Sequence, residues 1–206
     1  MHTGSVDFDR QLTKTGRWQA VSAAKAFGRS LRPFTPVALA SPAPRALETA
    51  ELFLDEAASD VTIETHASLY DGTIAARKPR PYSLDARSAR SIGTMQPDGA
   101  ALFRELGYAP LREYLPAGEA VLGAYARDAA GLVAGALTSE ADAPPPQKRR
   151  TLVLVAHAIY LPAAALHVAE ALGSDDATPI LDTNTAEAEG FLIEPDGAVS
   201  LLTRPK

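Results

Sequence analysis

Short uninterrupted runs of apolar residues alternate along this chain with longer segments in which apolar residues recur every three to four positions. The clearest run is Thr151–Val155 (TLVLV), and Pro36–Ala40 (PVALA) is a second run of the same kind; Val61–Glu64 (VTIE) is a further segment with the composition of a strand. Runs of four to five apolar residues rich in β-branched types are typical of strands buried on both faces of a parallel sheet. We therefore expect buried strands at the first two positions and a third strand at 61–64.

The segments with helical periodicity lie between these runs. The first helix begins near Thr13, whose hydroxyl is a suitable N-cap, and its apolar face repeats at helical spacing: Val21, Ala24, Phe27 and Leu31. A second helix is expected from Pro42–Pro44 to Leu54, because proline is favoured in the first turn of a helix. Two more helices are expected at 117–137 and 163–172, and Gly173 closes the last of them.

The remaining segments are shorter or less regular. Residues 73–116 form an irregular insertion with a basic bias, in which we expect one helix near 99–106. Pro179–Leu181 is expected to be a short strand, and residues 190–202 a hairpin that turns at Pro195-Asp196-Gly197. Strands that alternate with helices predict an α/β fold with a mostly parallel sheet.

Length and composition limit the possible functions. With 206 residues the chain can form one full core, so we expect a single domain, 1–206, that carries the insertion. The net charge of −5 argues against a nucleic-acid partner. No apolar run approaches the roughly 18 residues of a membrane span. Because the sequence contains no cysteine, disulfides and thiolate metal sites are excluded. We expect a cytoplasmic protein that binds neither nucleic acid nor membrane.

Two sets of polar residues follow predicted strands. His157 stands where the strand 151–155 gives way to a helix, and Ser41 and Arg45 follow the strand 36–40. Ligands of open α/β sheets usually bind at the carboxyl ends of the strands. A helix N-terminus with an arginine in its first turn is a natural site for an oxyanion. These residues therefore predict an anion-binding site at one edge of the sheet.

The motifs around these residues resemble those of the histidine phosphatase superfamily, also called the phosphoglycerate mutase-like family. The matching pieces are Leu12-Thr13-x-x-Gly16-x-x-Gln19-Ala20, Ser41-Pro42-x-x-Arg45-x-x-x-Thr49-Ala50-Glu51, and a later strand that ends in His157. The resemblance covers most of the chain. It implies a three-layer α/β/α sandwich with a mostly parallel central sheet.

The resemblance also implies the role of each site residue. His2 would be the nucleophile that becomes phosphorylated, while Arg45 and His157, with Ser41, would bind the phosphoryl oxygens. A neutral imidazole is a good nucleophile, and cationic donors balance the charge of a transferring phosphoryl group. Asp71, at the place of the family's Leu-x-Glu acid, would protonate the leaving oxygen. The histidines have no acidic partners at metal-ligand spacing, so neither a metal nor a cofactor is expected.

One feature departs from the family pattern. The family places an arginine before its nucleophilic histidine and a strand ahead of both, whereas Met1 precedes His2 here. Three explanations remain open. The natural start lies upstream, the motif has diverged in a phosphate-binding protein, or a short N-terminus still places His2.

Two functional hypotheses follow from the resemblance. The first is a metal-independent phosphatase that hydrolyses a phosphomonoester, carried by a small molecule or a phosphoprotein, through a phosphohistidine. The second is a catalytically weak or inactive relative that binds a phosphorylated ligand or a protein partner. A mutase is a third, weaker reading. Dimers are common in this family, so a homodimer is one expected oligomeric state.

Overall fold

The computed structural model describes residues 9–31, 35–57, 61–70, 105–138, 150–158 and 160–204. The elements run in the order α2 (Lys14–Leu31), β1 (Thr35–Ala40), α3 (Pro44–Ala57), β2 (Ile63–Thr65), a 3₁₀ turn (Ala67–Leu69), α6 (Leu111–Thr138), β3 (Arg150–Val155), α7 (Tyr160–Ala171), α8 (Thr178–Leu181), β4 (Gly190–Ile193) and β5 (Val199–Leu202). In the described part of the chain, no helix combines the length and the apolar character that crossing a membrane requires.

The three strands expected from the apolar runs form one parallel sheet in the order β2-β1-β3. All six residues of β1 pair in register with β3, from Thr35 opposite Arg150 to Ala40 opposite Val155. β2 pairs with the other side of β1, with Ile63 opposite Ala38. The mostly parallel sheet is therefore confirmed, and β1 is central among its described strands.

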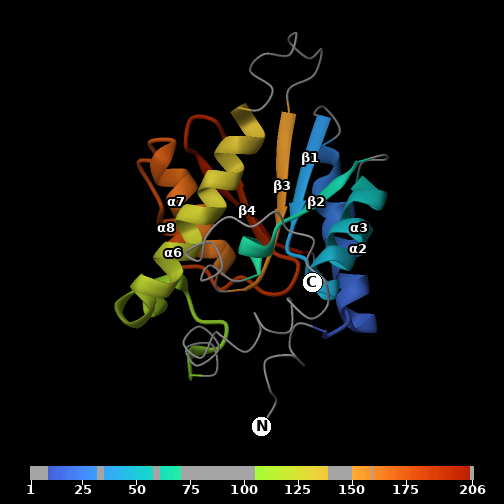
Figure 1. Cartoon of the computed structure of the whole chain (residues 1–206), viewed down its shortest axis with the longest axis horizontal. Helices are drawn as coiled ribbons and strands as arrows, with labels where there is room; N and C mark the ends of the chain where they lie inside the picture. The colour runs from blue at the N-terminus through green and yellow to red at the C-terminus, as the bar shows by residue number, and fades with distance from the viewer. Residues whose placement is uncertain are drawn as a thin grey trace.

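Helices cover both faces of this sheet, with α2 and α3 on one side and α6 and α7 on the other (Figure 1). The alternation of side chains along β3 connects the two sides. Val153 packs against the cluster of Ala24, Leu31 and Ala57, whereas Leu152 and Leu154 pack against the larger cluster built by α6 and α7. The expected three-layer α/β/α sandwich is confirmed.

Small residues bring α2 and α3 close together. The buried positions of this helix pair are mostly alanines: Ala20, Ala23, Ala24, Ala46, Ala50 and Ala57. A Cβ on Gly28 would lie 2.8 Å from both Cα and Cβ of Ala57, so the two backbones approach as closely as glycine permits. The helix α2 is capped as expected, because the Thr13 hydroxyl accepts a hydrogen bond from Gly16 N at 3.0 Å.

The C-terminal hairpin also forms as expected. β4 and β5 pair antiparallel, with Ile193 opposite Val199. Gly197 in the turn has a φ of +83°, and Gly173, at the end of α7, has a φ of +78°. Both positions need the left-handed conformation that glycine adopts without a steric cost.

Two predicted elements differ from the structure. Residues 178–181 form the short helix α8 rather than a strand, because Pro179 suits a first helical turn and Asp176 Oδ1 accepts a hydrogen bond from Thr178 N at 2.8 Å. The helix expected at 117 begins at Leu111, inside the segment expected to be irregular, and continues through Pro116. Leu111 and Tyr114 are buried there, and their packing outweighs the one backbone hydrogen bond that Pro116 cannot donate. Most of the helix expected at 99–106 lies outside the described residues.

Candidate functional site

The loops that follow β1 and β3 meet at the carboxyl edge of the sheet. Because the two strands are parallel and adjacent, Ser41 and His157 leave the sheet side by side. Ser41 N donates a hydrogen bond to Val155 O at 2.9 Å, which ties the first loop to the end of β3. Each loop leads into a helix, so the positive ends of α3 and α7 lie at this edge as well.

Ser41, Arg45 and His157 form one hydrogen-bonded group at this edge. The Nε2 atom of His157 lies 2.9 Å from Ser41 Oγ, and its Nδ1 atom lies 3.4 Å from a terminal nitrogen of Arg45. A guanidinium can only donate, so Nδ1 accepts from Arg45 and the proton of a neutral ring resides on Nε2. His157 therefore donates to Ser41 Oγ in this arrangement. The structure brings together the three residues that the sequence motifs predicted to bind phosphate.

Ser41 also fixes the start of α3. It is fully buried, and its Oγ accepts a hydrogen bond from Ala43 N at 3.3 Å. Ala43 O in turn accepts from Ala46 N and Leu47 N at 2.9 and 3.1 Å, which begins the helix around Pro44. Arg45 thus stands in the first turn of a helix whose N-terminus faces the sheet edge, where an anion is stabilised by both the dipole and the guanidinium.

The first turn of α7 starts at the same edge. His157 O accepts a hydrogen bond from Leu161 N at 2.9 Å, so the backbone of the histidine is part of the helix start. The residue is half-buried. Its backbone is consequently fixed where the sheet edge and the start of α7 meet, and its ring is oriented by Ser41 and Arg45.

Tyr70 is a member of this group that the sequence did not identify as a site residue. Its buried ring meets the His157 imidazole edge to face, with 5.3 Å between ring centroids and an interplanar angle of 85°. Such a contact restricts the orientation of the imidazole. The available signal was the position of Tyr70 in the segment that follows the third predicted strand, which begins at the same sheet edge as Ser41 and His157.

Two of the predicted catalytic residues lie outside the described residues. These are His2, the expected nucleophile, and Asp71, the expected general acid. Asp71 directly follows Tyr70 in the sequence. Their roles remain predictions.

A tyrosine–carboxylate pair lies near the site. A small hollow beside Ala158 is lined by Tyr108, Thr183 and Thr185. The Tyr108 hydroxyl donates to Glu187 Oε1 at 2.7 Å. Burial, together with the hydrogen bond to Glu187 and its negative charge, raises the pKa of Tyr108 to about 12. The hydroxyl is therefore a neutral donor at physiological pH.

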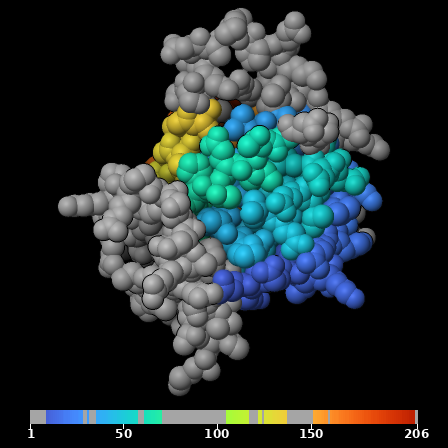
Figure 2. Space-filling model, turned by 45° about the vertical axis from the view of Figure 1, so that its right-hand side comes forward, coloured from blue at the N-terminus to red at the C-terminus, as the bar shows by residue number. Residues whose placement is uncertain are grey.

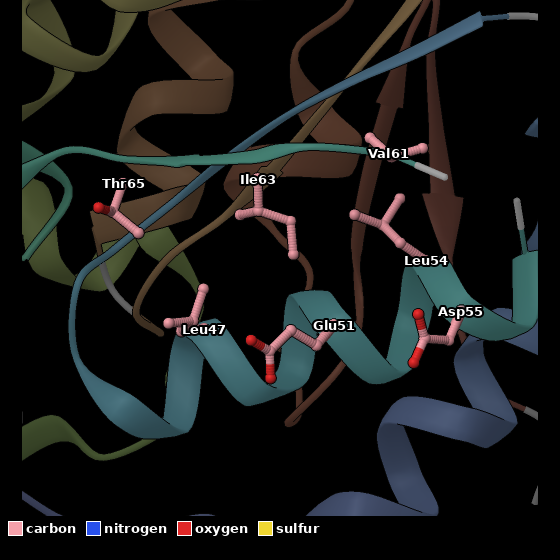
Figure 3. Close-up of a pocket in the computed structure, with 7 residues that line it drawn as sticks. All are labelled: Leu47, Glu51, Leu54, Asp55, Val61, Ile63 and Thr65. Atoms are coloured by element: carbon pink, nitrogen blue, oxygen red, sulfur yellow. The ribbon is translucent and has the colours of Figure 1, made fainter. Parts of the chain in front are cut away.

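A separate groove runs between α3 and β2 (Figure 3). Its volume is about 410 Å³, and the residues that line it are Leu47, Glu51, Leu54, Asp55, Val61, Ile63 and Thr65. None of the residues predicted to bind or transfer phosphate lines this groove. The anion-binding edge and the groove are therefore distinct surfaces of the described structure.

Comparisons with known proteins agree with the motifs and the fold. Residues 2–75 match the family model of the histidine phosphatase superfamily (branch 1). A mycobacterial glucosyl-3-phosphoglycerate phosphatase, solved with VO3, is similar with a TM-score of 0.53 and 20% sequence identity, over 97% of this chain and 88% of that chain. A second structure, "Mycobacterial hydrolase 1", has a TM-score of 0.49 and 20% identity, over 95% of this chain and 90% of that chain. No curated protein matches the chain. The resemblance to the superfamily is confirmed over the matched residues, and the fold is phosphoglycerate mutase-like.

Proposed function

We propose that this protein is a phosphatase that hydrolyses a phosphomonoester through a phosphohistidine intermediate. The observation that carries the proposal is the hydrogen-bonded group of Ser41, Arg45 and His157 at the carboxyl edge of the sheet. The family match over residues 2–75 supports it, because this stretch includes both the Ser-Pro-x-x-Arg motif and His2. A small phosphorylated molecule and a phosphoprotein are the two substrate classes we propose.

The reaction has two balanced steps. In the first, a ring nitrogen of His2 attacks phosphorus, a P–N bond forms, and the P–O bond to the leaving group breaks. Asp71 gives its proton to the leaving oxygen. In the second step water attacks phosphorus, Asp71 takes up a proton from that water, and the P–N bond breaks to release phosphate. No metal is required in either step, because cationic side chains neutralise the phosphoryl group.

Arg45 and His157 supply that neutralisation. Arg45 presents two or more N–H donors to phosphoryl oxygens, a geometry that lysine cannot reproduce. His157 already donates from Nε2, and its protonation would also turn Nδ1, which now accepts from Arg45, into a donor. An arriving phosphate therefore exchanges the Arg45–His157 hydrogen bond for bonds from both residues to its own oxygens.

The test is hydrolysis of p-nitrophenyl phosphate in the presence of EDTA. We expect Arg45→Lys and His157→Ala each to lower kcat/KM by about 10²–10³-fold, as loss of a transition-state donor does elsewhere. We expect His2→Ala to abolish turnover. His167→Ala is the matched control, since this histidine lies within α7 away from the described hydrogen-bonded group. Full activity of His2→Ala would exclude it as the nucleophile, and dependence on added metal would overturn the metal-free mechanism.

A second function rests on the same hydrogen-bonded group, because Ser41, Arg45 and His157 can bind a phosphoryl group without transferring it. The protein would then bind a phosphorylated ligand or partner and turn it over slowly or not at all. Calorimetric titration with inorganic phosphate distinguishes the two functions. Phosphate binding that depends on Arg45 and His157, in a protein that does not hydrolyse p-nitrophenyl phosphate, would support the second function.

A further inference from the structure

The groove between α3 and β2 combines an apolar floor with an acidic rim. On α3 the lining residues are spaced as one helical face, and on β2 they alternate as one strand face: Leu47, Glu51, Leu54, Asp55, Val61, Ile63 and Thr65. Leu47, Val61 and Ile63 are only partly buried, so aliphatic surface is accessible along the groove. Glu51 and Asp55 are exposed on the helix side, and Figure 3 shows both carboxylates along α3.

The two carboxylates carry unbalanced charge. Neither Glu51 nor Asp55 has an ion-pair partner among the described residues, unlike Glu48 on the same helix, which lies 2.5 Å from Arg17. They are one helical turn apart, so their negative charges lie on one wall of the groove. This wall repels anions such as phosphate and nucleic acid, and it attracts cationic side chains.

The other wall is the edge of the sheet. Within the described chain, β2 pairs with β1 alone. His66 N donates to Ala40 O at 3.0 Å, so the backbone groups of His66, and of Glu64 two residues earlier, point toward β1. The N–H and C=O groups of Ile63 and Thr65 therefore point away from β1. No described strand pairs with them, and addition of a strand at such an edge is a usual way for an extended peptide to bind a sheet.

We propose that the α3–β2 groove is a docking site for an extended segment of a partner protein with lysine or arginine at alternate positions. The main chain of this segment adds to the edge of β2 at Ile63 and Thr65. Its basic side chains lay their aliphatic stems on the leucine and valine floor and place their charges at Glu51 and Asp55. The face is accessible, since α2, α3 and the residues around β2 lie side by side on the surface turned forward in Figure 2.

The site is independent of the proposed phosphatase reaction. It requires the helix α3, the strand β2 and their charges, and none of the residues that bind phosphate. A peptide of about five residues in extended conformation covers the stretch 61–65, since a strand rises about 3.3 Å per residue. The groove volume of about 410 Å³ lies within the range of ligand sites in proteins.

A displayed library of random heptapeptides, selected against the full chain, tests the proposal. We expect the selected peptides to carry Lys or Arg at every second position, with small or β-branched residues between. In fluorescence anisotropy, the double variant Glu51→Gln/Asp55→Asn should bind the best selected peptide at least tenfold more weakly, and salt should weaken binding to the wild type. N-methyl groups at alternate peptide positions should abolish binding, because they remove the main-chain donors.

A charge-matched control separates local from general electrostatics. Glu56→Gln/Glu170→Gln removes the same charge from two exposed positions that do not line the groove, and it should bind the peptide like the wild type. Thermal unfolding of both double variants checks that the fold is intact. Selection of peptides without basic residues, or equal loss of affinity in both double variants, would overturn the proposal. So would full binding of the N-methylated peptide.

Discussion

Replacement of Gly197 by alanine tests the contact between the β4–β5 turn and the end of α7. Gly197 has a φ of +83°, and a Cβ at this position would lie 2.7 Å from Ser174 N and 2.9 Å from Ser174 Cα. Alanine in the left-handed region costs about 1–2 kcal/mol. Pressing the methyl group onto backbone atoms, which cannot rotate away, costs about 1–3 kcal/mol more. We therefore expect Gly197→Ala to lower the free energy of unfolding by about 2–5 kcal/mol.

The matched control is Gly173→Ala. This glycine has a similar φ of +78°, but a Cβ added to it would meet nothing within 4 Å. It should show the conformational cost alone, about 1–2 kcal/mol. Urea unfolding followed by circular dichroism measures both variants. The free energy of unfolding falls by about 2 kcal/mol per molar urea, so the additional steric cost in Gly197→Ala should separate the two urea midpoints by about 0.5–1.5 M. Equal midpoints would refute the reasoning, because the hairpin turn would then not be packed on α7.

Three further predictions concern other parts of the fold. Gly28→Ala should lower the thermal midpoint relative to Gly131→Ala on α6, because the first methyl meets the backbone of α3 whereas the second meets nothing within 4 Å and adds helix propensity; the opposite order would contradict the close approach of α2 and α3. Tyr125→Phe should cost about 1–3 kcal/mol in urea unfolding, since the buried Leu69 carbonyl loses its donor at 3.1 Å; an unchanged midpoint would show that this bond is worth little. Folding raises the pKa of Tyr108 to about 12, so the neutral hydroxyl contributes fully to stability below pH 10, and this contribution is lost as the pH rises toward 12. The difference in unfolding free energy between wild type and Tyr108→Phe should therefore shrink from about pH 10 to about 12. A constant difference would contradict the raised pKa.

Local patterns in the sequence were sufficient for much of the fold and for part of the site. The strand 151–155 and the capping threonine, Thr13, depend on residues that are neighbours in the chain, and both formed as predicted. Ser41 and His157 were placed together because parallel strands end at one sheet edge, which follows from strand order and not from any distant contact. These features all depend on interactions that are local in the chain or that follow from the order of the strands.

The sequence predictions that were wrong or incomplete concern residues whose structure is decided by tertiary packing. The helix was expected to begin at 117, yet the burial of Leu111 and Tyr114 makes α6 begin about a turn and a half earlier. Residues 179–181 are too few to show a period, so strand and helix could not be distinguished there. Tyr70 meets His157 only through the fold, and no spacing along the chain encodes that contact.

The alanine-rich contact between α2 and α3 has a consequence for the conformational entropy of the folded site. Alanine and glycine have no side-chain rotamers to freeze, so this contact forms without the loss of about 0.5–1 kcal/mol that each buried leucine would incur. Because alanine and glycine have no side-chain rotamers, they also cannot adjust to a larger neighbour. When a larger residue replaces Gly28, the backbone and methyl group of Ala57 cannot turn aside, so the two helices must move apart there. Because Arg45 stands in the first turn of α3, a larger residue on the face of α2 that contacts α3 would displace the Arg45 guanidinium.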